Sequence, residues 1–507
     1  NMRGITSRFD KYYTTDFHVF VNGKRSVSGV SSIEEYNWQI GSRGDYMSLN
    51  DFGNVKLNAG NNEIKLVFRK DDAHITDDKY IVIIDYFDFT PTEVDTGIID
   101  ISPKTETANV FYKGENVGFD AEFSKAASAE YSYSVKNVWD NKVKQGTFCT
   151  DGDSAEIILG TMPTGWYKME IIGANVSDSV ANPLFFSVVE RAERPQDTPF
   201  GADKQNKGLL IDDKINKAMG AAGIRMIRGG TDPYLGYNFA NYRETHEDFG
   251  RNSEQAAGMS ALLVYEHFGT QGMRETPEDL FEAYNMNKAM AEHYRSSGNA
   301  YEIWNEEEAG FYRQPADTFA SYFKAAAIGI SDGDSDAVKM PGGFGSTPEN
   351  FFVRTLLRND VISYSDAYAY HNHQVTINGE QNRDFIESVA RKHVDAACAY
   401  DPELQIWTTE AGISMTVDEN ETPSLDTLIS QARYYIVATA EQLAYGSDKS
   451  FWFRLNHYME SGNEWGTFSK ANQPYPAVNA IAARTARLGI GEYKGTLKTD
   501  SGSYGYM

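Results

Sequence analysis

Hydrophobic and polar residues alternate in short runs over the first part of the chain, and turn-forming residues separate the runs. Runs such as Phe17–Val21 and Glu63–Phe68 have the two-residue period of strands that bury one face, and Asn22-Gly23 is a typical hairpin turn. This pattern predicts an antiparallel β domain over residues 1–95.

A second segment of alternating pattern predicts another β domain over residues 96–192, and it resembles an immunoglobulin-type sandwich. Four strands are expected, at Asn116–Ala121, Ala129–Val138, Ala155–Leu159 and Trp166–Ile172. The polar stretch Glu190–Pro199 then interrupts the pattern, which is typical of an interdomain linker.

After Pro199 the pattern changes to short apolar runs that alternate with segments whose apolar residues recur every three or four positions, such as Pro277–Arg295 and Arg383–Tyr400. Alternation of this kind predicts parallel β/α units, and a closed (β/α)8 barrel over residues 193–490 accounts for eight of them. Residues 491–507 predict the start of a C-terminal β segment. The eight expected strands are Phe200–Gln205, Ile224–Arg228, Ala261–Glu266, Ala300–Trp304, Val338–Pro341, Ala367–His371, Leu404–Thr408 and Ser450–Leu455.

The predicted fold class is therefore multidomain, with a (β/α)8 TIM barrel preceded by two β-sandwich domains. The formal charge of −25 repels phosphate backbones, so nucleic acid is excluded as a partner, and a neutral ligand fits better. Aromatic residues make up 13% of the chain, enough to supply flat faces for sugar rings as well as core packing. No apolar run approaches the roughly 18 residues that a membrane span needs, so we expect no membrane insertion.

The sequence lacks the patterns that are typical of disulfide frameworks, metal sites and nucleotide sites. Cys149 and Cys398 fall in different predicted domains, which excludes a disulfide framework. The histidines of His371-Asn372-His373 lack a third ligand that the sequence can identify, and the glycine-rich Pro341–Gly345 lacks the lysine of a phosphate loop and the spacing of a dinucleotide site. We therefore predict no metal, no cofactor and no obligate protein partner.

Two carboxylates stand where a barrel places its chemistry, at the C-terminal ends of the strands. Glu306 follows the fourth expected strand and Glu410 follows the seventh. Retaining hydrolysis of a glycosidic bond needs two carboxyl groups about 5 to 5.5 Å apart, one acid and one nucleophile. A single Asn-Glu pair is usually a solvated turn or helix cap, but two carboxylates at these two strands favour catalysis. Glu307 and Glu308 are neighbouring alternatives, and Glu306 is preferred because it directly follows Trp304-Asn305.

The motifs Trp304-Asn305-Glu306 and Trp407-x-x-Glu410-x-Gly412 resemble those of the large clan of retaining glycoside hydrolases with (β/α)8 barrels. The order of the motifs and the strands that carry them also match. The resemblance implies that Glu306 is the acid/base, Glu410 the nucleophile, and Asn305 a hydrogen-bond donor to the sugar 2-hydroxyl. The chain resembles both the β-xylosidase and α-L-iduronidase family and the agarase and porphyranase group, without a choice between them.

Further candidate residues come from the other strand ends. Arg228 closes the second strand and could bond Glu410 and lower its pKa, although a surface arginine before Gly229-Gly230 is an equal alternative. Resembling enzymes often carry His or Tyr after the sixth strand, where His371 is preferred over His373. Trp452 is a candidate sugar platform or a core residue. The remaining substrate-binding candidates are Tyr370, His267 and Trp465.

The predicted function is a retaining glycoside hydrolase that cleaves a polysaccharide or oligosaccharide. Residues 55–64 and 84–89 resemble the last strands of jelly-roll carbohydrate-binding modules, so residues 1–95 are interpreted as such a module, whole or incomplete. An exo-acting glycosidase is one alternative, and a catalytically silent carbohydrate-binding protein is another. The chain starts at Asn1 without a signal-peptide pattern, so we expect that any signal was removed and that the protein is secreted or at the cell surface.

Overall fold

The computed structural model describes residues 2–8, 17–21, 24–25, 46–51, 62–68, 82–89, 98–123, 130–173, 183–204, 213–230, 255–265, 276–277, 279–295, 298–373, 376–377, 380–381, 383–418, 422–498 and 504–506.

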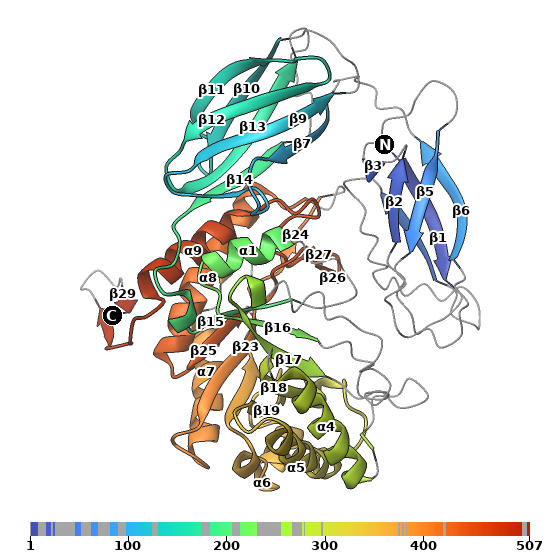
Figure 1. Cartoon of the computed structure of the whole chain (residues 1–507). Coiled ribbons are helices and arrows are strands. Elements are labelled where there is room, and N and C mark those ends of the chain that lie inside the picture. Colours follow the sequence, from blue (N-terminus) through green and yellow to red (C-terminus); the bar gives the residue numbers. More distant parts are fainter. Residues whose placement is uncertain are drawn as a thin grey trace.

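Eight parallel strands form the largest sheet (Figure 1). The first five pair in chain order, the last three pair in chain order, and the last strand pairs back with the first. A parallel bridge between Phe344 and Tyr370 joins the fifth strand to the sixth and completes the barrel. The predicted (β/α)8 barrel is confirmed. Its strands are β15 (Phe200–Asp203), β16 (Met226–Gly230), β17 (Ser260–Tyr265), β18 (Gly298–Asn305), β19 (Val338–Gly343), β20 (Ala367–His371), β23 (Gln405–Ala411) and β25 (Lys449–Trp452).

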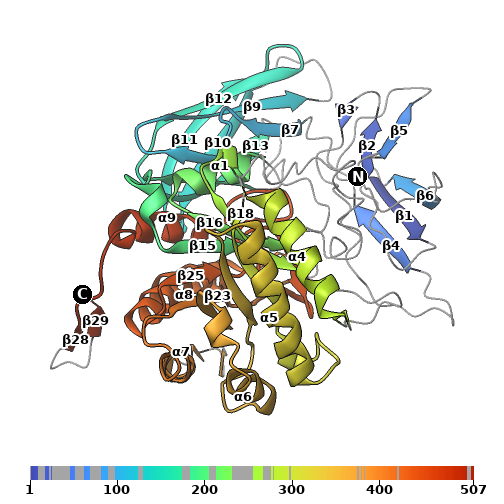
Figure 2. The same ribbon diagram turned by 60° about the horizontal axis from the view of Figure 1, so that its bottom comes forward.

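Helices surround the barrel, and α4 and α5 lie side by side on its outside (Figure 2). Side-chain oxygens cap several of their first turns: Asp279 accepts from Phe281 N, and Ser424 accepts from Thr427 N. The helical periods seen in the sequence correspond to α4 and α7. The helices are α1 (Asp213–Ala221), α4 (Leu280–Tyr294), α5 (Ala316–Gly333), α6 (Phe351–Arg358), α7 (Arg383–Cys398), α8 (Leu425–Ala444) and α9 (Pro476–Leu488).

Strand geometry divides the barrel core into an inner and an outer layer, because successive side chains point to opposite faces of a strand. Along β20, Ala367 and Ala369 belong to the inner cluster with Trp407 and Phe451. Tyr368 and Tyr370 belong to the outer cluster, which packs against the helices. A strand residue can therefore be fully buried without facing the mouth of the barrel.

Two further sheets, with orders β11-β10-β13-β14-β8 and β12-β9-β7, face each other across a common core that includes Phe111, Phe119 and Phe186. All four strands that the sequence predicted in this segment are present, as β9, β10, β12 and β13. The bounds are β7 (Ile98–Pro103), β8 (Val110–Tyr112), β9 (Asn116–Phe123), β10 (Glu130–Asn137), β11 (Lys142–Cys149), β12 (Ser154–Thr161), β13 (Gly165–Gly173) and β14 (Leu184–Val189).

This pair of sheets is bonded to the barrel domain. Trp166 Nε1 donates to Pro474 O at 2.8 Å, and Asn479 Nδ2 of α9 donates to Val188 O at 2.9 Å. Phe185 packs on a small cluster that contains Met415, just beyond β23. The sheets therefore rest on α9 and on loops at one end of the barrel (Figure 1).

Among the described residues of the first part of the chain, two antiparallel sheets are present, β4-β1-β6 and β3-β2-β5, and at the C-terminal end β28 pairs antiparallel with β29. The domain limits and the jelly-roll and immunoglobulin-like assignments stay predictions. Both cysteines are free thiols, and among the described helices none is long and apolar enough to cross a bilayer. The remaining strands are β1 (Met2–Arg8), β2 (Phe17–Val21), β3 (Lys24–Arg25), β4 (Tyr46–Asp51), β5 (Ile64–Phe68), β6 (Val82–Phe89), β21 (Thr376–Ile377), β22 (Glu380–Gln381), β24 (Met415–Thr416), β26 (Met459–Glu460), β27 (Asn463–Glu464), β28 (Thr496–Lys498) and β29 (Tyr504–Tyr506).

Candidate active site

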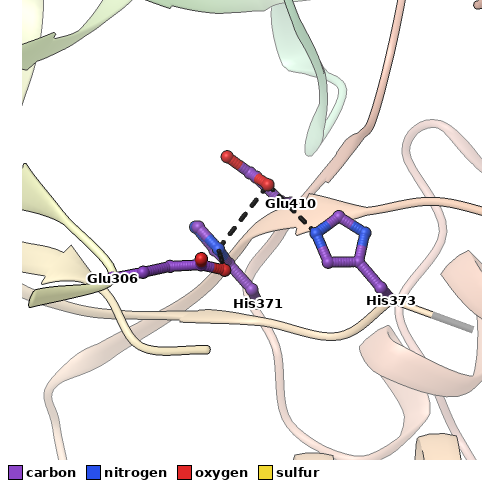
Figure 3. Close-up of side chains that lie close together, drawn as sticks. All are labelled: Glu306, His371, His373 and Glu410. Carbon is purple, nitrogen blue, oxygen red and sulfur yellow. Dashed lines mark hydrogen bonds and ion pairs between the residues drawn. The ribbon is translucent and has the colours of Figure 1, made fainter. Parts of the chain in front are cut away.

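Glu306 and Glu410 meet at the C-terminal mouth of the barrel (Figure 3). Glu306 follows the last residue of β18, the fourth strand, and Glu410 lies near the end of β23, the seventh. Backbone hydrogen bonds hold both positions: Glu306 N donates to Gly343 O at 3.2 Å, and Asn372 N donates to Glu410 O at 2.8 Å. A carboxylate oxygen of each glutamate lies within 4.8 Å of one from the other. The strand ends therefore bring the two predicted carboxylates face to face.

A histidine contacts each of the two glutamates. His371 Nδ1 and Glu306 Oε1 are 2.7 Å apart, and His373 Nε2 and Glu410 Oε2 are 3.0 Å apart. His371 Nδ1 also lies 3.6 Å from Glu410 Oε2. The sequence favoured His371 over His373 as the functional residue of this loop. The structure gives both residues a contact with the pair, and the hydrogen bond to Glu410 belongs to His373.

Arg228 is buried beneath the pair and binds several groups at once, so the alternative of a surface arginine is wrong. Its guanidinium group is 3% exposed and forms a close ion pair with Glu410. It donates two hydrogen bonds to Glu302, from Nε to Oε2 at 3.0 Å and from Nη2 to Oε1 at 2.6 Å. It also donates from Nη1 to Asp203 Oδ2 at 2.7 Å and from Nη2 to Asn305 Oδ1 at 2.7 Å.

Electrostatic interactions in this site set the charge of its groups. Burial by itself raises the pKa of Glu410, but His371, Arg228 and His373 outweigh it and lower the pKa well below its usual value. Burial lowers the pKa of His371, yet Glu410, Glu302 and Glu306 raise it to about 10. Glu410 is therefore an anion, and His371 is an imidazolium at neutral pH.

Asn305 and Trp465 lie close to the pair. The Asn305 side chain turns its oxygen to Arg228, which leaves the amide nitrogen on the other side as a donor. Trp465 is half-buried, and its ring lies 5.4 Å from the His373 ring and 5.3 Å from that of Phe453. His267, the remaining candidate from the third strand end, lies outside the described residues.

Two predicted substrate-binding residues, Trp452 and Tyr370, are buried and do not face the mouth, so the structure contradicts the role predicted for them. Trp452 is 1% exposed and packs outward with Tyr435 of α8 and Arg484 of α9, as the alternative of a core residue requires. Tyr370 is fully buried in the outer layer, where its hydroxyl bonds Ser447 Oγ at 2.9 Å. The cause is strand alternation, which directs Phe451 and His371 inward and their neighbours outward.

The sequence reading missed three charged residues under the mouth: Glu302, Asp203 and Arg454. Glu302 is fully buried on Arg228, and Arg454 Nε donates to Asp203 Oδ1 at 3.0 Å. The sequence could have indicated the position of Glu302. It lies two residues after Ala300 of the inner cluster, and side chains two positions apart on a strand point to the same face. A charged residue on the inner face of a barrel strand is costly without a partner and so marks a polar network.

The two alternatives to Glu306 are enclosed in the protein. Burial raises the pKa of Glu307 well above its usual value, and its carboxylate oxygens have no hydrogen-bond partner among the described residues. Gly342 leaves room for this side chain, since a Cβ there would lie 2.4 Å from Glu307 Oε2. Glu308 Oε1 accepts from Ser346 N at 2.6 Å, and its second oxygen is also buried. Among these three acids, Glu306 is the one that meets Glu410.

The fold and the site together define a TIM barrel with paired carboxylates at its mouth. No protein-family model matches the sequence, and no curated protein matches it either. Among solved structures, a family 39 glycoside hydrolase from the gut symbiont Bacteroides cellulosilyticus WH2 is similar, with a TM-score of 0.61 at 15% identity over 79% of this chain and 85% of that one.

Two further similar structures have lower scores. One is a glucosidase from Croceicoccus marinus, with a TM-score of 0.44 at 14% identity over 57% of this chain and 67% of that one. The other is a β-glucuronidase from Ruminococcus gnavus, with a TM-score of 0.41 at 12% identity over 96% of this chain and 86% of that one. The similarity to the family 39 enzyme shows that this chain shares the fold of that glycoside hydrolase.

Proposed function

We propose that the protein is a retaining glycoside hydrolase that acts on a polysaccharide or oligosaccharide. The observation that carries this proposal is the approach of Glu306 and Glu410, which offer carboxylate oxygens within 4.8 Å of one another at the barrel mouth. Carboxyl groups of retaining enzymes are about 5 to 5.5 Å apart, whereas those of inverting enzymes are about 6.5 to 9.5 Å apart to admit a water molecule. The short separation favours double displacement.

In the first step, a Glu410 oxygen forms a bond to the anomeric carbon while the glycosidic bond breaks and Glu306 gives its proton to the leaving oxygen. Arg228 and His373 stabilise Glu410 as the anion that this attack requires. In the second step, Glu306 takes a proton from water, the water oxygen attacks the anomeric carbon, and Glu410 leaves as a carboxylate. Two inversions give a product with the configuration of the substrate.

The contacts of the neighbouring residues support named roles. The hydrogen bond from His371 fixes the Glu306 carboxyl group, and Asn305, held by Arg228, is placed to donate to a sugar hydroxyl. Trp465 supplies an aromatic face beside His373. The fold shared with a family 39 glycoside hydrolase supports a carbohydrate substrate. The chemistry of these two carboxylates needs no cofactor.

The proposal also covers the β domains before the barrel and the location of the protein. The β domains before the barrel favour a polymer substrate, because a binding module raises the local concentration of an enzyme on a long chain. Action on chain ends is the second candidate. Secretion or display at the cell surface follows from a polymer substrate, which cannot enter a cell intact.

The proposal is tested with the purified protein on a panel of plant, algal and host polysaccharides, with chromatography of the products. Once a substrate is found, NMR during the first minutes reads the anomeric configuration of the new reducing end. We expect the substrate's configuration at that carbon. Inversion would contradict the mechanism, and tight binding without release of sugar would favour the silent carbohydrate-binding protein.

A further inference from the structure

Four side chains at the barrel mouth form a set of nitrogen and oxygen ligands, which we call the mouth cluster: Glu306, His371, His373 and Glu410 (Figure 3). Each residue offers one ligand atom, and these four atoms all lie within 4.8 Å of one another. The sequence showed only the two histidines as a ligand pair. The barrel supplies the missing partners from β18 and β23, on either side of β20.

The spacing of the mouth cluster suits a small tetrahedral ion. Zn²⁺ binds imidazole nitrogen and carboxylate oxygen at about 2.0 to 2.2 Å, which places neighbouring ligand atoms about 3.3 Å apart. His371 Nδ1 lies 2.7 Å from Glu306 Oε1 and 3.6 Å from Glu410 Oε2, and His373 Nε2 lies 3.0 Å from Glu410 Oε2. Changes of about 0.3 to 0.6 Å would bring these three distances to that value, and the other pairs of ligand atoms lie within 4.8 Å of one another.

The charge balance around the mouth cluster also favours a cation. Arg228 bonds Asp203, Glu302 and Glu410, and Arg454 also bonds Asp203. Two guanidinium groups and the His371 imidazolium therefore stand against four carboxylates, those of Asp203, Glu302, Glu306 and Glu410. Buried carboxylates in excess of their counter-charges are costly, and a divalent ion between two of them removes that cost. The backbone bonds at Glu306, His371 and Asn372 hold the ligands in place before any ion arrives.

We propose that the mouth cluster binds a divalent transition cation of the Zn²⁺ class, and that the bound ion blocks hydrolysis. The ion takes an oxygen from each carboxylate and a nitrogen from each histidine, and the His371 imidazolium releases its proton to the solvent as it becomes a ligand. Glu410 can then no longer attack, and Glu306 can no longer donate its proton. Imidazole ligands select zinc-class ions over Mg²⁺ and Ca²⁺, which prefer oxygen. The binding stands on the geometry alone, whereas the inhibition rests on the proposed function.

Isothermal titration of the full chain, stripped with chelator and titrated with ZnCl2, tests the binding. We expect one saturable Zn²⁺ site and no heat of binding from MgCl2. Titration with CoCl2 is expected to give the visible absorption bands of tetrahedral Co²⁺. His373→Gln is expected to weaken Zn²⁺ binding by more than about 10-fold. Loss of a group that only hydrogen-bonds a metal ligand already lowers metal affinity by about that factor. Glu306→Gln is a second test variant, and circular dichroism checks the fold of each.

The matched control is His293→Gln, which removes a histidine from α4, outside the mouth cluster. Zn²⁺ binding unchanged by both His373→Gln and Glu306→Gln, or no binding in the wild-type chain, would overturn the site. With an active substrate in hand, Zn²⁺ is expected to inhibit at the concentrations where it binds, with recovery on adding chelator. Zinc bound without inhibition would overturn the block. Because the titration needs no substrate, a failure of the proposed hydrolase activity leaves the binding test intact.

Discussion

His371 and His393 are both buried, on opposite sides of the same strand, and their surroundings shift their pKa values in opposite directions. His371 ends β20 on its inner face, where carboxylates raise its pKa to about 10. His393 lies in α7 against the outer face, stacked on Tyr370 and bonded to Tyr368 Oη at 2.8 Å. There, burial lowers its pKa to about 3. Burial alone therefore does not decide the state of a histidine, because facing charges do.

The same contrast separates the inner and outer faces of the whole barrel. At the mouth, the inner face holds Arg228, Glu302 and Glu410 in one charged network. The outer face of the barrel strands holds Trp304, Tyr370 and Trp452, which pack against helices. The proposed chemistry therefore belongs to the inner face, and substitutions on the outer face should affect stability before they affect turnover.

The largest effect is expected from Glu410→Gln, because the proposed nucleophile is needed for every substrate. The amide keeps the shape of the side chain but cannot form the glycosyl-enzyme. Turnover should fall by more than about 10⁴-fold on good and poor leaving groups alike. Steady-state rates with two aryl glycosides of different leaving-group acidity give the measurement, and near-normal activity of this variant would show that Glu410 is not the nucleophile.

Turnover of Glu306→Gln should fall by a smaller factor, about 10² to 10⁴-fold on substrates with poor leaving groups, because the substitution removes acid/base assistance. An activated aryl glycoside should still form the glycosyl-enzyme, and azide should release it as a glycosyl azide. The azide product should keep the anomeric configuration of the substrate, because two inversions occur. A product of opposite configuration, identified by NMR, would mean that the two roles are assigned wrongly.

Acidification should destabilise the protein through His393. Its folded pKa of about 3 lies below the unfolded value of about 6.5, so the unfolded chain takes up the proton first and stability falls as pH drops below about 6.5. The loss of unfolding free energy from this group at pH 5 should be about 2 kcal/mol. Urea unfolding at pH 7 and pH 5 measures it in wild type and in His393→Gln, which keeps an acceptor for Tyr368. Equal pH dependence in the two proteins would rule out this contribution.

The smallest effect is expected from Tyr370→Phe. The change removes the hydroxyl that bonds Ser447, which keeps a second partner in Thr408 at 2.9 Å. Unfolding free energy should fall by about 1 kcal/mol, with KM unchanged. A raised KM at unchanged stability would instead restore Tyr370 as a substrate-binding residue and break the distinction between the two faces.

The sequence by itself determined the barrel and the place of two carboxylates at its mouth. The change of hydrophobic period after Pro199 counted the strands correctly, and the residues that follow a strand must lie at the mouth, so Glu306 and Glu410 could be placed from local pattern alone. Strand parity was also in the sequence. The alternation of side chains along each strand predicts that Trp452 and Tyr370 lie in the outer layer and that Glu302 faces the inside of the barrel.

Only the tertiary structure decided which groups touch. Arg228 and Glu410 are 182 positions apart, and His371 and Glu306 are 65 apart, so closure of the barrel creates these contacts. The sequence could name His371 and His373 as neighbours, but it could not show that each bonds a different catalytic candidate. The charge of a buried group depends on the field of all the groups that face it. That field exists only once distant strand ends have been brought within a few ångströms of one another.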